Sequence, residues 1–134
     1  YESHWTDGRE DGLWKKWYKN GLLKDVYELG KEDGLWKSWY ENGQLRFEKN
    51  YKNGKNDGIE KKYYENGQLE YEEKYKDDLQ IGLWKRWYEN GQLKDESHWT
   101  DGKRDGLRKR WYENGQLQDE SHWTDGKLDW SKRY

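Results

Sequence analysis

The sequence of 134 residues contains no cysteine and no proline, and only 30% of it is hydrophobic. Without cysteine the chain can form neither a disulfide framework nor a thiolate metal site. So low a hydrophobic fraction is typical of disordered chains. However, the 11 Trp and 12 Tyr residues supply large apolar areas, and proline, common in disordered linkers, is absent. We therefore expect a folded chain built around aromatic rings.

The chain also lacks a long apolar run and an excess of either charge. No stretch approaches the roughly 20 apolar residues that a membrane-spanning helix needs, and residues 1–4 show no signal-peptide pattern. The expectation is a soluble chain, and both a cytoplasmic location and secretion after signal removal are compatible with it. The net charge is −2 and the two signs alternate along the chain, whereas nucleic-acid binding needs a basic stripe. Nucleic acid is therefore not expected as a partner.

Internal repetition is the strongest positive signal. Five frames begin at a glycine and end at an Asn-Gly dipeptide, with a period of 24 residues except for a first step of 22. A second segment recurs between the frames, clearest at residues 96–102 and 120–126. Residues 1–134 therefore read as one repeat domain with partial repeats at both ends. The five frames start at Gly12, Gly34, Gly58, Gly82 and Gly106.

Each repeat is predicted to contain two strands and two turns. Asn-Gly between strand-like runs favours a two-residue type I′ hairpin, because both central residues of that turn need positive φ. Longer loops are expected at the second turns, which are Asp7-Gly8, Leu29-Gly30, Asn53-Gly54, Asp77-Asp78, Asp101-Gly102 and Asp125-Gly126. The predicted fold is all-β: an elongated, single-layer, twisted antiparallel meander of about eleven strands, built from double-hairpin repeats of about 24 residues.

Two rows of residues are the same in every frame and are predicted to form the structural aromatic and leucine core. They are Tyr18, Tyr40, Tyr64, Tyr88 and Tyr112, and Leu23, Leu45, Leu69, Leu93 and Leu117. A two-residue Asn-Gly turn pairs Tyr40 with Leu45 and sets Tyr51 across from Gly34, which its ring would cover. A three-residue loop shifts this register by one and moves the leucine row to the other face. The first register is favoured, and the second stays open.

At these residues the sequence resembles the MORN-repeat variant family, whose bacterial members often carry an antitoxin-like label. The likeness lies in the run Gly-x-Trp-x-x-Tyr-Tyr-x-Asn-Gly-x-Leu, repeated over essentially the whole chain. The resemblance implies an elongated β-meander with an aromatic-lined groove, used as a scaffold for protein partners and sometimes proposed to meet membrane lipid. The chain departs from the pattern at Glu60 and Arg108, which replace a Trp, and at Asp78, which replaces a turn glycine.

The sequence gives little support for catalysis or for a cofactor. Ser97 and Ser121 each precede a histidine, but neighbours in a strand point to opposite faces, so we expect solvent-facing strand residues. His98 and His122 would lie two strands apart, roughly 9–10 Å, which is too far to share a metal ion. The many Glu, Lys and Arg residues are expected to form cross-strand ion pairs. No enzyme activity, cofactor or metal is therefore predicted.

Binding is the function class that remains. The best candidates for ligand contact are Trp14, Trp36 and Trp84, because their position tolerates Trp, Glu and Arg; surface packing is the alternative role. The leading hypothesis is a protein-interaction scaffold that neutralises a partner or assembles with itself through open sheet edges. Carbohydrate or cell-wall binding through aromatic cages is the first alternative. Membrane-lipid binding is the second.

Overall fold

The computed structural model describes residues 3–5, 13–28 and 34–134, with the backbone alone for residues 3–5, 13, 14, 23 and 26–28. These residues form thirteen strands in one sheet. The strands are β1 Ser3–Trp5, β2 Leu13–Trp17, β3 Leu23–Glu28, β4 Gly34–Trp39, β5 Leu45–Lys52, β6 Lys55–Asn56, β7 Gly58–Tyr63, β8 Leu69–Lys76, β9 Leu79–Trp87, β10 Leu93–Thr100, β11 Lys103–Trp111, β12 Leu117–Thr124 and β13 Lys127–Arg133. None of the described residues forms a helix that could span a membrane.

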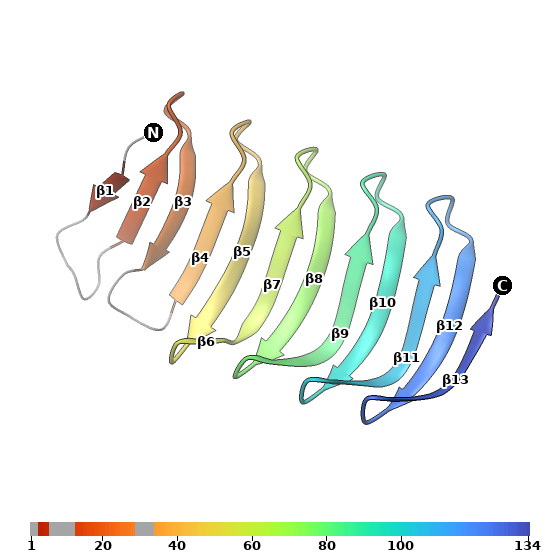
Figure 1. Cartoon of the computed structure of the whole chain (residues 1–134). Helices are drawn as coiled ribbons and strands as arrows, with labels where there is room; N and C mark the ends of the chain where they lie inside the picture. The colour runs from red at the N-terminus through yellow and green to blue at the C-terminus, as the bar shows by residue number, and fades with distance from the viewer. Residues whose placement is uncertain (1–2, 6–12, 29–33) are drawn as a thin grey trace.

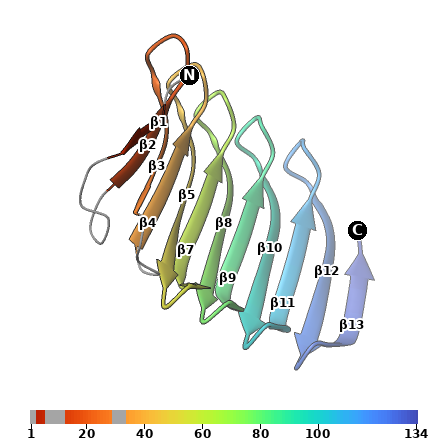
Figure 2. The same cartoon turned by 60° about the vertical axis from the view of Figure 1, so that its left-hand side comes forward.

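The sheet follows the chain from one end to the other. Each strand pairs antiparallel with the next, and only the two-residue β6 lies off this path, against β5. The result is an elongated, twisted single layer with β1 and β13 at its opposite ends (Figures 1 and 2). The predicted all-β meander is confirmed. There are more strands than the predicted eleven, partly because Asp57 separates β6 from β7, whereas β9 and β11 run through the equivalent position.

The Asn-Gly turns differ from the prediction. In the loop between β4 and β5, the Gly43 N–H donates to the Tyr40 carbonyl (3.0 Å) and the Tyr40 N–H donates to the Gln44 carbonyl (2.8 Å). Gly43 has φ 89°, whereas Asn42 is not among the residues with positive φ. This is a three-residue loop, a type I turn closed by a left-handed glycine, and the prediction of type I′ was wrong here.

The second turns also differ from the prediction, because they are shorter than expected. Both residues have positive φ in Asp101-Gly102 (48° and 82°) and in Asp77-Asp78 (50° and 68°). Thr100 pairs directly with Lys103 across the first of these turns. The described second turns are therefore tight two-residue hairpins rather than longer loops, and they are the turns that meet the type I′ requirement. Asp7-Gly8 and Leu29-Gly30 lie outside the described residues.

A bulge decides the register within each repeat. Leu45 pairs with Trp39, not with Tyr40 as predicted, because the loop has three residues. The register then shifts between Trp39 and Ser38, which restores the alignment lost at the loop. Tyr51 therefore does lie across from Gly34, as predicted. The same pairing recurs in Gly58–Tyr75, Gly82–Trp99 and Gly106–Trp123.

Neither face of the sheet is covered by a second layer, so the described residues include no fully buried hydrophobic side chain. The leucines of the predicted core whose side chains are described, Leu45, Leu69, Leu93 and Leu117, are partly buried. The most buried side chains are polar: Ser38, Glu73, Ser97, Asp119 and Ser121. The last four have side-chain hydrogen-bond partners, whereas the Ser38 hydroxyl has none among the described residues. Specific pairing therefore takes over part of the role of an apolar core.

The tyrosine before each Asn-Gly turn joins successive repeats. The Tyr40 hydroxyl donates to the Tyr63 carbonyl (2.6 Å), and the Tyr64 hydroxyl donates to the Trp87 carbonyl (2.7 Å). Tyr18 and Tyr88 make the equivalent bonds. Tyr112 is 45% exposed, and its hydroxyl has no such bond within the described residues. This row therefore ties one double hairpin to the next.

Candidate binding face

Alternation along the strands separates two faces. One face, called the groove face below, carries Gly34, Trp36, Ser38, Phe47, Lys49, Tyr51 and the equivalent residues of the later repeats. The opposite face carries Leu35, Lys37, Trp39, Leu45, Glu48, Asn50 and their equivalents. The assignment follows from the register, because paired residues point to the same side of a sheet.

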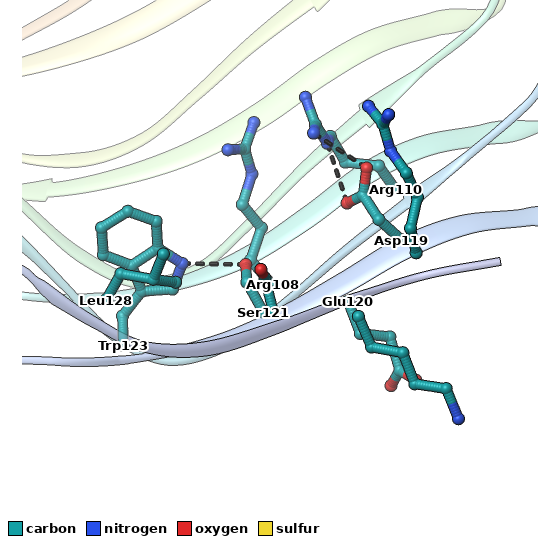
Figure 3. A pocket seen from close by; sticks show the side chains of 10 residues that line it. Arg108, Arg110, Asp119, Glu120, Ser121, Trp123 and Leu128 are labelled. Atoms are coloured by element: carbon teal, nitrogen blue, oxygen red, sulfur yellow. Dashed lines mark hydrogen bonds and ion pairs between the residues drawn. The ribbon is translucent and has the colours of Figure 1, made fainter.

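Three hollows lie along the groove face. The first, of about 420 Å³, lies over β4 to β8 and is lined by Arg46, Phe47, Lys49 and Tyr71 among others. The second, about 280 Å³, lies over β9 to β11. The third, about 360 Å³, lies over β11 to β13 and is shown in Figure 3. The groove face therefore offers a series of shallow sites along the long axis of the sheet.

Two of the three predicted binding residues can be placed on this face. Trp36 packs edge-on against Phe47, with ring centroids 5.5 Å apart. Trp84 lies between Tyr75 (5.2 Å) and Trp99 (5.1 Å), and its Nε1 donates to the Lys74 carbonyl (3.1 Å). Both tryptophans are partly buried. The backbone of Trp14 pairs with Trp5 and Tyr27, and its side chain lies outside the described set.

The structure explains why the same position accepts Glu and Arg. The Glu60 carboxylate accepts a hydrogen bond from the Tyr71 hydroxyl at 2.7 Å. Arg108 forms a bidentate pair with Asp95, at 2.8 and 3.4 Å. Each replacement thus has a polar partner on the neighbouring strand. The chemistry of the groove face therefore changes from repeat to repeat while the backbone stays the same.

The middle of the groove face is acidic and tyrosine-rich. Glu73 is 4% exposed, accepts from Arg86 (2.7 Å) and accepts from the Tyr75 hydroxyl (3.1 Å). Burial raises the pKa of Glu73, and the Arg86 guanidinium opposes that rise. Burial and the hydrogen bond to Glu60 raise the pKa of Tyr71 far above its usual range, so its hydroxyl stays protonated. In this cluster each carboxylate is therefore already paired with a neighbouring side chain.

Arginines dominate the C-terminal part of the groove face. Arg110 holds Asp119 in a bidentate pair at 3.0 and 2.8 Å (Figure 3). Arg104 is arranged differently, because its guanidinium lies between two tryptophan rings, 5.1 Å from the Trp99 centroid and 5.3 Å from the Trp123 centroid. Burial lowers the pKa of Arg104, and the nearby Arg108 charge lowers it further.

The serines of this face were wrongly predicted to face solvent. Ser97 is only 7% exposed and Ser121 only 9%. Their hydroxyl oxygens accept from Trp99 Nε1 (2.8 Å) and Trp123 Nε1 (2.9 Å), the second of which is drawn in Figure 3. The serines therefore fix the orientation of the tryptophan rings that hold Arg104.

The opposite face carries ion pairs and histidines. Cross-strand pairs join Lys37 to Glu48 (4.0 Å) and Lys61 to Glu72 (3.9 Å), as the sequence predicted. The His98 ring stands over Gly106, and its Nδ1 lies 3.0 Å from the Leu107 carbonyl. Ser97 and His98 point to opposite sides, which is the arrangement that argued against a Ser-His pair. Within the described ranges no group of three or more His, Asp or Glu side chains could hold a metal ion.

Sequence reasoning missed Arg104, Ser97 and Ser121 as parts of the candidate site. One signal was available for Arg104: it is the first arginine after the Glu-Ser-His-Trp segment at residues 96–99, two residues beyond the Asp101-Gly102 turn. Recognising it required knowing that the second turn is a two-residue hairpin. With a longer loop there, Arg104 would not pair with Trp99.

Comparison with known proteins agrees with this architecture. The family model described as MORN repeat variant matches residues 32–53, 56–77, 80–101 and 104–128, four consecutive repeats that together cover more than half of the chain. A search of curated proteins found no match to the chain. The matched spans follow the repeats of the sheet: each contains one three-residue loop, the first three end at the first residue of a two-residue turn, and the fourth runs through the turn at residues 125–126. The chain belongs to the MORN repeat variant family.

Proposed function

We propose that the chain is a non-enzymatic interaction scaffold whose groove face binds a segment of a protein partner. The observation that supports the proposal is the series of three hollows on one face of an uncovered sheet. Tryptophan, tyrosine and arginine line them, and these residue types are enriched in the energetically dominant centres of protein interfaces. A long single-layer sheet offers such a surface without any further domain.

The aromatic residues of the groove face are held in place before a partner arrives. Trp84 is fixed by two ring contacts and one hydrogen bond, and Trp99 by its bond to Ser97. Ordering a rotamer-rich side chain on binding costs roughly 0.5–1.5 kcal/mol. Because these rings are already ordered, a partner meets a pre-organised surface.

The spacing of the repeats suits an extended partner segment. Equivalent strands of successive repeats lie two strands apart, about 10 Å, and an extended chain rises about 3.3 Å per residue. About three residues of partner therefore correspond to one repeat. A segment of about ten residues would span the hollows over β4 to β11.

Cell-wall binding through an aromatic cage that takes a cationic headgroup such as choline is less well supported. Trp36, Phe47 and Tyr51 resemble an aromatic cage, but the Lys49 ammonium already lies 5.1, 5.8 and 5.4 Å from their ring centroids. A cationic headgroup would have to displace this lysine. The cage therefore favours an internal contact over a cation-binding site.

Trp84→Arg is a test suggested by the chain itself, because Arg108 occupies the equivalent position of the next repeat. The substitution should preserve the fold while removing the central ring of the groove face. We expect the wild-type chain to capture a partner from lysate of the source cells, and Trp84→Arg to retain less than a tenth of it. The control is Lys85→Ala, a neighbouring change on the opposite face, which should leave capture unchanged.

Equal capture of the partner by all three chains would show that the partner does not bind the groove face. If none of the three chains captured a protein from the lysate, the scaffold proposal would be contradicted for the source cells. Light scattering of the purified chain over a wide concentration range separates self-assembly, including pairing at the exposed edge strand β13, from capture of a different protein.

A further inference from the structure

Arg104 is a positively charged residue held in a rigid aromatic clamp. It lies on β11 and pairs through its backbone with Trp99 of β10. The rings of Trp99 and Trp123, from two successive repeats, lie on its guanidinium at 5.1 and 5.3 Å. Each ring is oriented by a buried serine, Ser97 or Ser121. The clamp fixes the plane of the guanidinium and leaves its edge for hydrogen bonding.

The other arginines around this hollow are already paired. Arg86 binds Glu73 at 2.7 Å, and Arg108 binds Asp95 at 2.8 Å. Arg104 has no carboxylate oxygen within 4.0 Å in the described part of the chain, and its buried Nε has no hydrogen-bond partner there. Arg104 is therefore the uncompensated cation of this part of the groove face.

The adjoining hollow has the size and the polar groups for a small anionic group. It measures about 280 Å³ and is lined by Arg86, Arg104, Arg108, Asp95, Ser97, Trp84 and Trp99. Three arginines face two carboxylates, Asp95 and Glu73, which leaves one net positive charge. The Ser97 oxygen accepts from Trp99, and its own proton has no acceptor among the described residues. The hollow therefore offers an unpaired cation beside a buried hydroxyl donor.

We propose that this hollow binds a side-chain carboxylate of the partner, with the Arg104 guanidinium donating to it in a fork and the Ser97 hydroxyl as a further donor. This inference rests on the proposed function, and it specifies the partner segment as an acidic one. A carboxylate carries the single negative charge that balances Arg104. A phosphate dianion would bring a second charge that faces Asp95 and Glu73 without compensation.

The electrostatic setting of Arg104 agrees with this assignment. Burial and the neighbouring Arg108 both lower the pKa of Arg104. An arriving anion would offset both effects, and charge-assisted hydrogen bonds of the Arg–carboxylate type are strong and geometrically specific. The same bidentate geometry already occurs nearby, in the Arg110–Asp119 pair at 3.0 and 2.8 Å.

The test uses two blocked ten-residue peptides that differ only in having glutamate or glutamine at every third position. Binding is followed by Trp fluorescence and by the NMR signal of the Arg104 Nε–H group. We expect the glutamate peptide to bind saturably and to shift that signal, and the glutamine peptide to bind at least tenfold more weakly. Arg104→Gln should weaken binding of the glutamate peptide at least tenfold.

Lys109→Gln is the matched control, because it removes one positive charge from the same strand but on the opposite face, where Lys109 lies 4.0 Å from Glu120. It should change the affinity by less than twofold. Arg104→Lys keeps the charge and loses the planar fork, so we expect a several-fold loss. This variant serves in place of Arg104→Gln if the latter does not melt cooperatively.

Three results would overturn the inference: equal binding of the two peptides, equal loss in Arg104→Gln and Lys109→Gln, or saturable Arg104-dependent binding of inorganic phosphate or anionic lipid vesicles without binding of the glutamate peptide. The capture experiment with Trp84→Arg has a different readout, although Trp84 also lines this hollow. Groove-dependent capture without carboxylate selectivity would leave the scaffold proposal standing and remove only the acidic partner.

Discussion

One hydroxyl group per repeat connects the double hairpins. The tyrosine that precedes each of the first four Asn-Gly turns donates to a backbone carbonyl 21 to 23 residues later in the chain, at 2.6 to 2.8 Å. Burial raises the pKa of Tyr18, Tyr40 and Tyr64, so their protons stay on the donor side at neutral pH. The carbonyl acceptor belongs to the aromatic residue that ends the first long strand of the next repeat. The sequence row of invariant tyrosines therefore marks a contact between repeats.

Tyr40→Phe removes this hydroxyl and keeps the ring. We expect the free energy of unfolding to fall by about 0.5–1.5 kcal/mol, the usual net contribution of one hydrogen bond. Chemical denaturation of the variant and the wild type measures the difference. Tyr112→Phe is the control, because the Tyr112 side chain is 45% exposed and should cost almost nothing. Equal losses in both variants would contradict a special role for the hydroxyl of Tyr40.

At the scale of the hairpin, two kinds of turn alternate along the chain. The Asn-Gly loop is longer, and its asparagine is bonded on both sides: Asn42 Oδ1 accepts from the Gln44 N–H (2.9 Å), and Asn42 Nδ2 donates to the Glu65 carbonyl of the next repeat (3.1 Å). The Asp-Gly turn is tight and takes the type I′ form. The three-residue loop therefore lets its asparagine side chain bond to the corresponding loop of the next repeat.

Gly91→Ala tests the loop design. Gly91 has φ 89°, and an added Cβ would lie 3.4 Å from the Gln68 Oε1 atom, which is an ordinary contact. Any cost should therefore come from the left-handed backbone, about 1–2 kcal/mol. Thermal or denaturant melting gives the value. The control is Glu89→Ala, in the same exposed loop, which should change the free energy of unfolding by less than about 0.5 kcal/mol. If Gly91→Ala also changed it by so little, the loop would be able to adopt another turn type.

At the scale of the whole molecule, the sheet behaves as a one-dimensional stack. Almost all contacts between strands join neighbours in the sheet. No central core links distant repeats, because the described residues include no buried hydrophobic side chain. Stability in such a chain is approximately the sum of repeat and nearest-neighbour terms. Damage to one repeat should therefore remain local.

Leu117→Ala tests this locality. Leu117 is partly buried on β12, so the loss should be about 1–2 kcal/mol, below the 2–5 kcal/mol of a fully buried leucine. Hydrogen exchange should speed up in β11 to β13 and stay unchanged in β5 and β8. Leu45→Ala should speed up exchange in β4, β5 and β7 and leave β11 to β13 unchanged. Uniform acceleration along the chain in either variant would show that the sheet unfolds as one cooperative unit.

The sequence by itself determined the repeat and the all-β class, because these depend on the period and on the alternation of residue types. The pairing of Tyr51 with Gly34 was predicted from a two-residue turn, and the structure keeps it only because the bulge beside Trp39 offsets the three-residue loop. Only the tertiary structure decided the turn types. Asn-Gly is compatible with a type I′ turn and with a three-residue loop that ends in a left-handed glycine, and local sequence does not choose between them. In the loop that forms, Asn42 Nδ2 donates to the Glu65 carbonyl of the next repeat. The site was decided in the same way. Ser97 is buried by its contact with Trp99, and Arg104 lies between Trp99 and Trp123. These contacts cross strands whose register depends on bulges and tight turns. Local sequence preference does not specify those bulges and turns.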